Sequence, residues 1–265
     1  NCNDPGIIEA NRSRLGYDLP FFTQYFLFLK GLFVGRTFGE GAAILVGDLA
    51  LSWADEMLLT CDLPPDQITR AKLIYDLMRT ELMSGQYLDL LEQVRGGITQ
   101  DRAEVVIRYK SAKYTIERPL HMGAVIAGAD AKLLAALSRY GLALGEAFQL
   151  RDDLLGVFGN AEVTGKPAGD DLREGKQTML IAHATSSASE PDRQFLLAHL
   201  GSASIAEATI AKLQTILIEC GSQDFIEERI AAGLAAAMSA LSEITDQESN
   251  SALAALAILA TNRTA

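Results

Sequence analysis

Acidic and basic residues between positions 148 and 178 are the part of the chain best suited to chemistry. This stretch holds two aspartate pairs and two lysines that each follow a glycine; they are Asp152–Asp153, Asp170–Asp171, Lys166 and Lys176. Carboxylate oxygens are hard ligands that Mg²⁺ accepts, and the metal together with ammonium groups neutralises phosphate oxygens. The segment therefore predicts a site that holds a polyphosphate through Mg²⁺.

The first aspartate pair lies in a helical pattern with Gln149. Residues three and four positions apart share one helix face, so Gln149 can lie beside Asp152 and Asp153. An aspartate pair on a helix is usually solvated or an N-cap, but the flanking residues here are apolar: Ala147, Phe148, Leu150, Leu154, Leu155 and Val157. Because a carboxylate pair within a buried helix requires a cation or a ligand, we favour metal binding by this pair.

The segments that must position these residues are expected to be long helices. The chain has 265 residues, and its long stretches rich in Ala and Leu contain no proline, which favours helices. Alternating β-branched runs bounded by turn pairs are lacking, so a sheet is not expected. Helices are expected over 21–34, 38–59, 66–85, 102–114, 129–158, from about 172, and over 192–200, 204–219, 223–245 and 251–261. Without a linker or repeat, one all-α domain over 1–265 is predicted.

Short signals divide these helices. Gly96–Gly97 is expected to form a loop, and Thr99 is expected to cap the helix that follows. Pro119 is expected to end or kink that helix, because proline lacks the N–H that a helix interior needs.

Charge and cysteine content limit the partners and the compartment. The net charge of −11 argues against nucleic acid, whose phosphates attract basic surfaces. The most apolar runs, 21–35 and 251–260, are interrupted or too short to span a bilayer, so no transmembrane segment is expected. The cysteines are Cys2, Cys61 and Cys220; their odd number and irregular spacing fit the reducing cytoplasm.

Several motifs of the chain resemble those of the trans-prenyltransferases, also called isoprenyl (polyprenyl) diphosphate synthases. Their second aspartate-rich region is similar to DDLLG at 152–156 and to GKPAGDDLREGKQT at 165–178. Lys110–Ser111 is similar to the family's Lys–Thr/Ser pair, at the family's spacing of forty-two residues before Asp152. Further agreement lies in Phe148–Gln149, in Gly85–Gln86 with Asp89, and in 38–51. The resemblance extends from about residue 38 to the C-terminus, and within the family it points to the geranylgeranyl diphosphate synthases.

This resemblance implies a fold, a reaction and a role for each matching residue. It implies an isoprenoid-synthase-type helical bundle around a deep central cavity, acting as a homodimer that joins isopentenyl diphosphate to an allylic prenyl diphosphate. Asp152 would ligate Mg²⁺ with help from Asp153. The allylic diphosphate would be held by Lys110, Ser111, Gln149 and Lys166, of which Lys110, Gln149 and Lys166 are the candidate catalytic residues. Lys176 would add a further positive charge, and Asp170 and Asp171 would orient the lysines.

Two departures from the family pattern bear on this interpretation. Position 156, where many members have aspartate, is Gly156, so a carboxylate is expected to be missing from that helix face. The family's first aspartate-rich motif and its Arg-Arg stretch are also missing. Either a segment is absent at a seam near 31–37, which leaves the N-terminal part incomplete, or the protein has lost the motif. We favour the first, because 148–178 is intact.

Two other functions fit a chain without the first motif. One is a non-catalytic partner subunit of such a synthase. The other is a terpene cyclase, which would use one acid-rich motif and a single prenyl substrate. The cyclase is disfavoured because Lys110 and the Gly-Lys loops belong to the synthase pattern.

Overall fold

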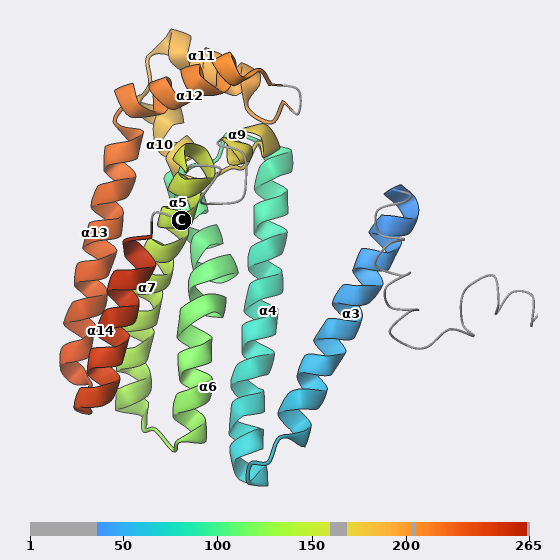
Figure 1. The fold of residues 1–265 in the computed structure, drawn as a ribbon, viewed down its shortest axis with the longest axis vertical. Helices are drawn as coiled ribbons and strands as arrows, with labels where there is room; N and C mark the ends of the chain where they lie inside the picture. Colours follow the sequence, from blue (N-terminus) through green and yellow to red (C-terminus); the bar gives the residue numbers. More distant parts are fainter. Residues whose placement is uncertain (1–35, 160–168, 203–204, 264–265) are drawn as a thin grey trace, which may run out of the picture. The chain divides into compact units, whose positions relative to one another are not determined.

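The computed structural model describes residues 36–159, 169–202 and 205–263, and every regular element in these ranges is a helix. The all-α prediction is therefore confirmed (Figure 1). The chain divides into two compact units, 1–63 and 64–265. The described part of the first unit is α3 (Arg36–Thr60), which agrees with the helix expected over 38–59. The helix expected over 21–34 and most of the seam near 31–37 lie outside the described residues.

The second unit is a bundle of long helices with shorter helices at one end. Within it α4, α6, α7, α13 and α14 lie side by side, and α11 and α12 lie across one end (Figure 1). Its elements are α4 (Pro65–Arg95), α5 (Gln100–Ile107), η1 (Arg108–Glu117), α6 (Arg118–Ile126), α7 (Ala131–Phe158), α9 (Asp170–Glu174), α10 (Met179–Ser187), α11 (Glu190–His199), α12 (Glu207–Glu219), α13 (Ser222–Ala240), η2 (Leu241–Glu243) and α14 (Gln247–Thr261).

Local signals account for several of these boundaries. Thr99 accepts a hydrogen bond from the backbone N–H of Arg102, as its expected role as an N-cap requires. Asp130 caps α7 in the same way through Leu133. Gly96 and Gly97 have positive φ angles of 67° and 61°, which glycine adopts without steric cost. The loop between α4 and α5 is therefore confirmed.

Helix α4 continues ten residues beyond the end expected at Gly85. Gly85 is buried within the helix, and a side chain there would collide with η1, since an ideal Cβ lies 2.4 Å from the backbone nitrogen of Lys110. The glycine therefore serves close packing between helices and does not end α4, so the expectation of a boundary near Gly85 was wrong.

The expected α-helix over 102–114 is replaced in part by a π-helix, η1. At its end the N–H of Arg118 bonds to the carbonyl of Lys113, five residues back, as π-helices require. Pro119 follows within the first turn of α6, where a missing N–H costs little. The chain remains helical from α5 through α6, so Pro119 does not end the helix.

Helix α7 is the central element of the second unit, because it contributes to both of its hydrophobic cores. Leu150, Leu154 and Val157 belong to one core, with residues of α5, α10, α12 and α13. Leu137, Tyr140 and Leu144 belong to the other, with residues of α13 and α14. Burial on both sides fixes α7 and, with it, the polar residues near its C-terminal end. Among the described residues, no helix has the length and apolarity needed to cross a membrane.

Candidate active site

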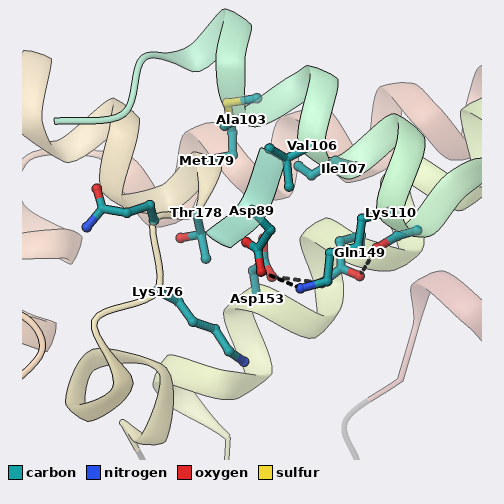
Figure 2. A pocket seen from close by; sticks show the side chains of 12 residues that line it. Asp89, Ala103, Val106, Ile107, Lys110, Gln149, Asp153, Lys176, Thr178 and Met179 are labelled. Carbon is teal, nitrogen blue, oxygen red and sulfur yellow. Dashed lines mark hydrogen bonds and ion pairs between the residues drawn. The ribbon is translucent and has the colours of Figure 1, made fainter. Parts of the chain in front are cut away.

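A pocket with a cavity volume of about 60 Å³ lies beside the C-terminal half of α7. Its polar lining comes from four separate segments (Figure 2): Asp89, Lys110, Ser111, Gln149, Asp153, Lys176, Gln177 and Thr178. Its apolar lining comes from α5 and α10: Ala103, Val106, Ile107 and Met179. Five residues singled out in the sequence therefore meet in one place, and their helices are held there by the cores on both sides of α7.

Three of these polar side chains form a chain of hydrogen bonds from η1 to α7. The hydroxyl of Ser111 donates to Oε1 of Gln149 at 2.6 Å. Nε2 of Gln149 then donates to Oδ1 of Asp153 at 2.9 Å, one turn further along α7. This arrangement fixes which end of the Gln149 amide faces each neighbour.

Lys110 is held in place by Asp89, a residue that motif matching noted but did not assign to the site. Its Nζ donates to Oδ2 of Asp89 at 2.7 Å, and the Asp89 side chain is 16% exposed. The two residues come from η1 and α4, and Figure 2 shows the ion pair between them. The spacing of Asp89 four residues after Gly85 was the available signal, since it places both on the face of α4 that meets η1.

The two adjacent aspartates of α7 have different surroundings. Asp153 is 6% exposed and lines the pocket, and burial, with the charges of Asp171 and Asp152, raises its pKa to about 7. The side chain of Asp152 is 54% exposed, and Oδ1 lies 3.5 Å from Nη2 of Arg263. Gln149 and Asp153 therefore share the pocket face, while Asp152 lies beside that face and closer to solvent.

Asp171 fills the space that a side chain at position 156 would need. An ideal Cβ on Gly156 lies 2.3 Å from Oδ2 of Asp171. The carboxylate expected to be missing from this face of α7 is thus replaced by one from α9. Burial raises the pKa of Asp171 even though Lys176 donates a hydrogen bond to its Oδ1. For Lys176, burial lowers the pKa, but its interactions with Asp171 outweigh this and leave the pKa raised.

The donor atoms of this region suit a magnesium ion shared with a phosphorylated ligand. No three carboxylate, histidine or cysteine side chains converge on one point within the described residues. Mg²⁺ usually takes only one or two protein carboxylates and completes its shell with phosphate oxygens and water. The raised pKa of Asp153 reports a carboxylate without enough positive charge nearby. The other predicted ligand of the diphosphate, Lys166, lies outside the described residues.

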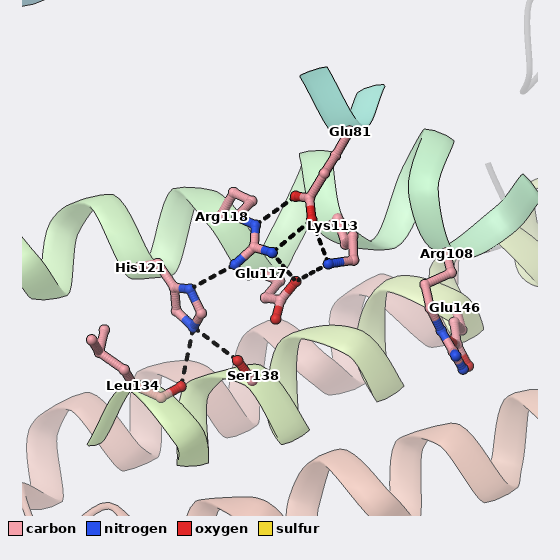
Figure 3. Close-up of polar contacts among 9 residues, drawn as sticks. All are labelled: Glu81, Arg108, Lys113, Glu117, Arg118, His121, Leu134, Ser138 and Glu146. Atoms are coloured by element: carbon pink, nitrogen blue, oxygen red, sulfur yellow. Dashed lines mark hydrogen bonds and ion pairs between the residues drawn. The ribbon is translucent and has the colours of Figure 1, made fainter. Parts of the chain in front are cut away.

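A second buried polar group, the ion cluster, joins α4, η1 and α6 away from the pocket; it consists of Glu81, Lys113, Glu117 and Arg118 (Figure 3). Glu81 accepts from Lys113 at 2.6 Å and from Arg118 at 2.7 and 2.8 Å. Burial alone would raise the pKa of Glu81, but these hydrogen bonds outweigh it and lower the pKa.

His121 beside the cluster is also buried. Its ring is hydrogen-bonded to the carbonyl of Leu134, and burial lowers its pKa. It is a packed histidine.

Comparison with known proteins identifies the family of the chain. The family model described as polyprenyl synthetase matches residues 33–217. A (2E,6E)-farnesyl diphosphate synthase of Mycobacterium bovis is 34% identical over 191 residues, which are 71% of this chain and 52% of that protein. A geranylgeranyl diphosphate synthase of Methanosarcina mazei is 34% identical over 190 residues, 71% of this chain and 56% of that protein. The chain thus spans about half the length of these relatives.

A solved structure extends the likeness to the fold. It is a geranylgeranyl pyrophosphate synthase from Corynebacterium glutamicum, complexed with isoprenyl diphosphate and magnesium. The TM-score is 0.82 at 36% sequence identity, and the alignment covers 97% of this chain and 69% of that one. With a family model matched over most of its length and relatives of this similarity, the chain belongs to the polyprenyl synthetase family.

Proposed function

We propose that the protein is a prenyltransferase that condenses isopentenyl diphosphate with an allylic prenyl diphosphate to give a longer polyprenyl diphosphate. The observation that carries the proposal is the convergence of Lys110, Ser111, Gln149, Asp153 and Lys176 around one pocket. Relatives named as farnesyl and geranylgeranyl diphosphate synthases support it. We also propose that residues 1–265 act as a single helical domain in this reaction.

The polar side chains of the pocket keep donors for the allylic diphosphate. The Lys110 ammonium has three N–H groups, and Asp89 accepts from one of them. The Gln149 amide has two, and Asp153 accepts from one. We assign these remaining donors and the Lys166 ammonium to the diphosphate oxygens, and we propose that Ser111, whose single O–H now donates to Gln149, turns that O–H to the ligand. They would stabilise the negative charge that grows on the leaving diphosphate, with no protein nucleophile required.

Asp152 and Asp153 are the residues that we propose hold Mg²⁺. When bound, the ion would neutralise diphosphate oxygens and so favour departure of the leaving group. The supporting observation is that burial, together with the charges of Asp171 and Asp152, raises the pKa of Asp153. Asp171 would orient the Lys176 ammonium beside this pair, because the two residues form an ion pair.

The apolar wall of the pocket has a separate task. Ala103, Val106, Ile107 and Met179 face the polar residues across the cavity (Figure 2). An allylic cation that forms when diphosphate leaves is destroyed by water, so a wall without polar groups protects it until isopentenyl diphosphate attacks.

We propose in addition that the protein is a cytoplasmic homodimer. Cys61 and Cys220 are free thiols, which is usual in a reducing compartment. Helix α4 leaves Leu73, Leu90 and Val94 exposed, and an apolar helix face of this kind favours a covering partner. Sedimentation at micromolar concentration tests this: a dimer should have twice the 28.5 kDa mass of one chain.

One assay tests the function against its two rivals. The protein is incubated with Mg²⁺, radiolabelled isopentenyl diphosphate and a C5, C10 or C15 allylic primer. Labelled longer prenyl products support the proposal. Volatile hydrocarbons without label would instead indicate a terpene cyclase. No turnover by the chain alone, with turnover restored by a second subunit, would indicate a non-catalytic partner.

A further inference from the structure

Two glycines lie where the π-helix η1 is pressed between α4 and α7. An ideal Cβ on Gly85 of α4 would lie 2.4 Å from the nitrogen and 2.8 Å from the Cα of Lys110. An ideal Cβ on Gly145 of α7 would lie 2.5 Å from the Cα of Ala112. Both contacts involve the backbone of η1, so a side chain could be accommodated only if a helix moved.

These contacts lie at and next to the residues proposed to hold the diphosphate. Gly85 touches η1 at Lys110 and Gly145 touches it at Ala112, so Ser111 lies between the two contacts and Lys110 lies at the first. On α7, Gly145 is followed at four-residue intervals by Gln149 and Asp153, so the three share one face. The glycine face of α7 thus packs on η1, and the next turns of the same face supply the pocket.

We propose that Gly85 and Gly145 are positioning residues, which set the distance of η1 from α4 and α7 and thereby place Lys110 and Ser111 against Asp89 and Gln149. The inference rests on the proposed function for the identity of the ligand.

The size of the expected displacement can be compared with the hydrogen bonds it would affect. Relieving a 2.5 Å contact requires a shift of about 1 Å, because carbon atoms pack at roughly 3.5–4.0 Å. The same shift would stretch the 2.6 Å bond from Ser111 to Gln149 beyond the range of a hydrogen bond. Misplacement of this order can cost about 100-fold in binding or rate.

Gly141 of α7 also packs closely against the backbone of η1, but further from the pocket. Its ideal Cβ would lie 2.8 Å from the Cα of Glu117, at the other end of η1. Gly123 of α6 offers a control, because nothing lies within 4 Å of its ideal Cβ. Alanine is therefore expected to be tolerated at 123.

The experiment measures binding of inorganic pyrophosphate with Mg²⁺ by calorimetry, in the full chain and in folded variants checked by circular dichroism and urea unfolding. Gly85→Ala and Gly145→Ala should each weaken binding at least tenfold, Gly141→Ala less, and Gly123→Ala less than twofold. With turnover substrates, KM for the allylic diphosphate should rise more than KM for isopentenyl diphosphate. Wild-type affinity in folded Gly145→Ala would overturn the inference.

Two further measurements keep the result decisive. If Gly145→Ala does not fold, it is combined with Ala112→Gly. This second substitution removes the methyl that the new Cβ would meet at 2.8 Å but keeps the backbone contacts. Wild-type affinity in the double variant would again contradict the inference.

If the wild type binds no pyrophosphate, the proposed function fails. The side-chain amide resonances of Gln149 then decide the glycine inference, since unchanged resonances in Gly145→Ala would rule it out.

Discussion

The ion cluster and the pocket are both buried polar groups along η1, but their charges are balanced differently. In the ion cluster two acids, Glu81 and Glu117, face two bases, Lys113 and Arg118. The pKa of Glu81 is lowered and that of Arg118 is raised, so each charge is stabilised by its partner. The charges of this group therefore balance one another, although the buried Oε2 of Glu117 accepts no hydrogen bond from the described residues.

The pocket end of α7 lacks this balance. Asp153 is buried, receives a hydrogen bond from a neutral amide, and lies near two further carboxylates, so its pKa rises to about 7. Lys110 and Lys176 are already paired with Asp89 and Asp171. A buried acid that its own protein leaves short of positive charge is what a site for an added cation requires. The contrast separates a network whose charges balance one another from one that we propose binds a cation.

The largest effect is expected at Asp152. Asp152→Ala should reduce turnover at least about 1,000-fold, because a lost metal ligand removes several kcal/mol of transition-state stabilisation. Its half-exposed side chain contributes little packing, so the urea midpoint should stay near that of the wild type. Incorporation of labelled isopentenyl diphosphate measures the turnover, and Asp192→Ala, on α11, is the control. Retained turnover would remove the metal assignment.

The ion cluster should show the reverse pattern, a loss of stability. Glu81→Gln leaves Lys113 and Arg118 buried with only the more distant Glu117 as a charged partner, and breaking a buried pair costs about 3–5 kcal/mol. Urea unfolding at pH 7 measures the change. Asp76→Asn on the same helix is the matched control, because Asp76 also pairs with Lys72 and Arg79 but lies at the surface; its midpoint should change little. Equal effects of the two substitutions would argue against a structural role for the cluster.

A pH series should separate the two regions further. Below about pH 4 the Asp153 carboxyl holds a proton in folded and unfolded chains alike. Between about pH 4 and pH 7 only the folded chain keeps it, so this contribution to stability declines as pH rises and is lost above about pH 7. The decline should be on the order of 2–4 kcal/mol.

The measurement is urea unfolding without divalent metal from pH 4.5 to pH 8, for the wild type and Asp153→Asn. The variant should become relatively more stable as pH rises, because an amide carries no charge to desolvate. Parallel curves for the two proteins would contradict the assignment of the raised pKa to Asp153.

The smallest effect is expected from Lys176. Its charge lowers the pKa of Asp153, so Lys176→Ala should raise that pKa further. Binding of Mg²⁺ with pyrophosphate, followed against pH, should then begin at slightly higher pH than in the wild type. Lys212→Ala, on α12 where Nζ lies 3.8 Å from the Phe195 ring centre, should leave the profile unchanged. A shift in both variants would indicate a general charge effect.

Much of this architecture was predictable where one local signal decides the structure. Thr99 and Asp130 are polar caps before apolar helical patterns, and both boundaries follow from that pattern. The end of α4 was not predictable, because a glycine that breaks a helix and one that lets another helix approach look alike in sequence. At Gly85 the second role applies, and only the packing of η1 reveals it.

The residues of the candidate site were easier to predict than the contacts between them. Motif spacing identified Lys110, Gln149 and Asp153, which meet at the pocket. It did not reveal that Asp171 supplies the carboxylate at the face of Gly156, since that depends on how α9 packs against α7. Nor did it distinguish the buried Asp153 from the exposed Asp152, because neighbours in a helix differ by about 100° in direction.

In the segment that forms the π-helix, the number of residues matters more than their identity. Adding or removing one residue in an α-helix rotates all residues beyond it by about 100° about the helix axis. In η1 the wider turns fix the direction of Arg118, just past its end, relative to that of Lys110, near its start. Deletion of one residue between Ser111 and Glu117 would leave composition and charge almost unchanged. After such a deletion, Arg118 could not reach Glu81 while Lys110 still faces Asp89. Deletion of one residue here should therefore be less well tolerated than most substitutions.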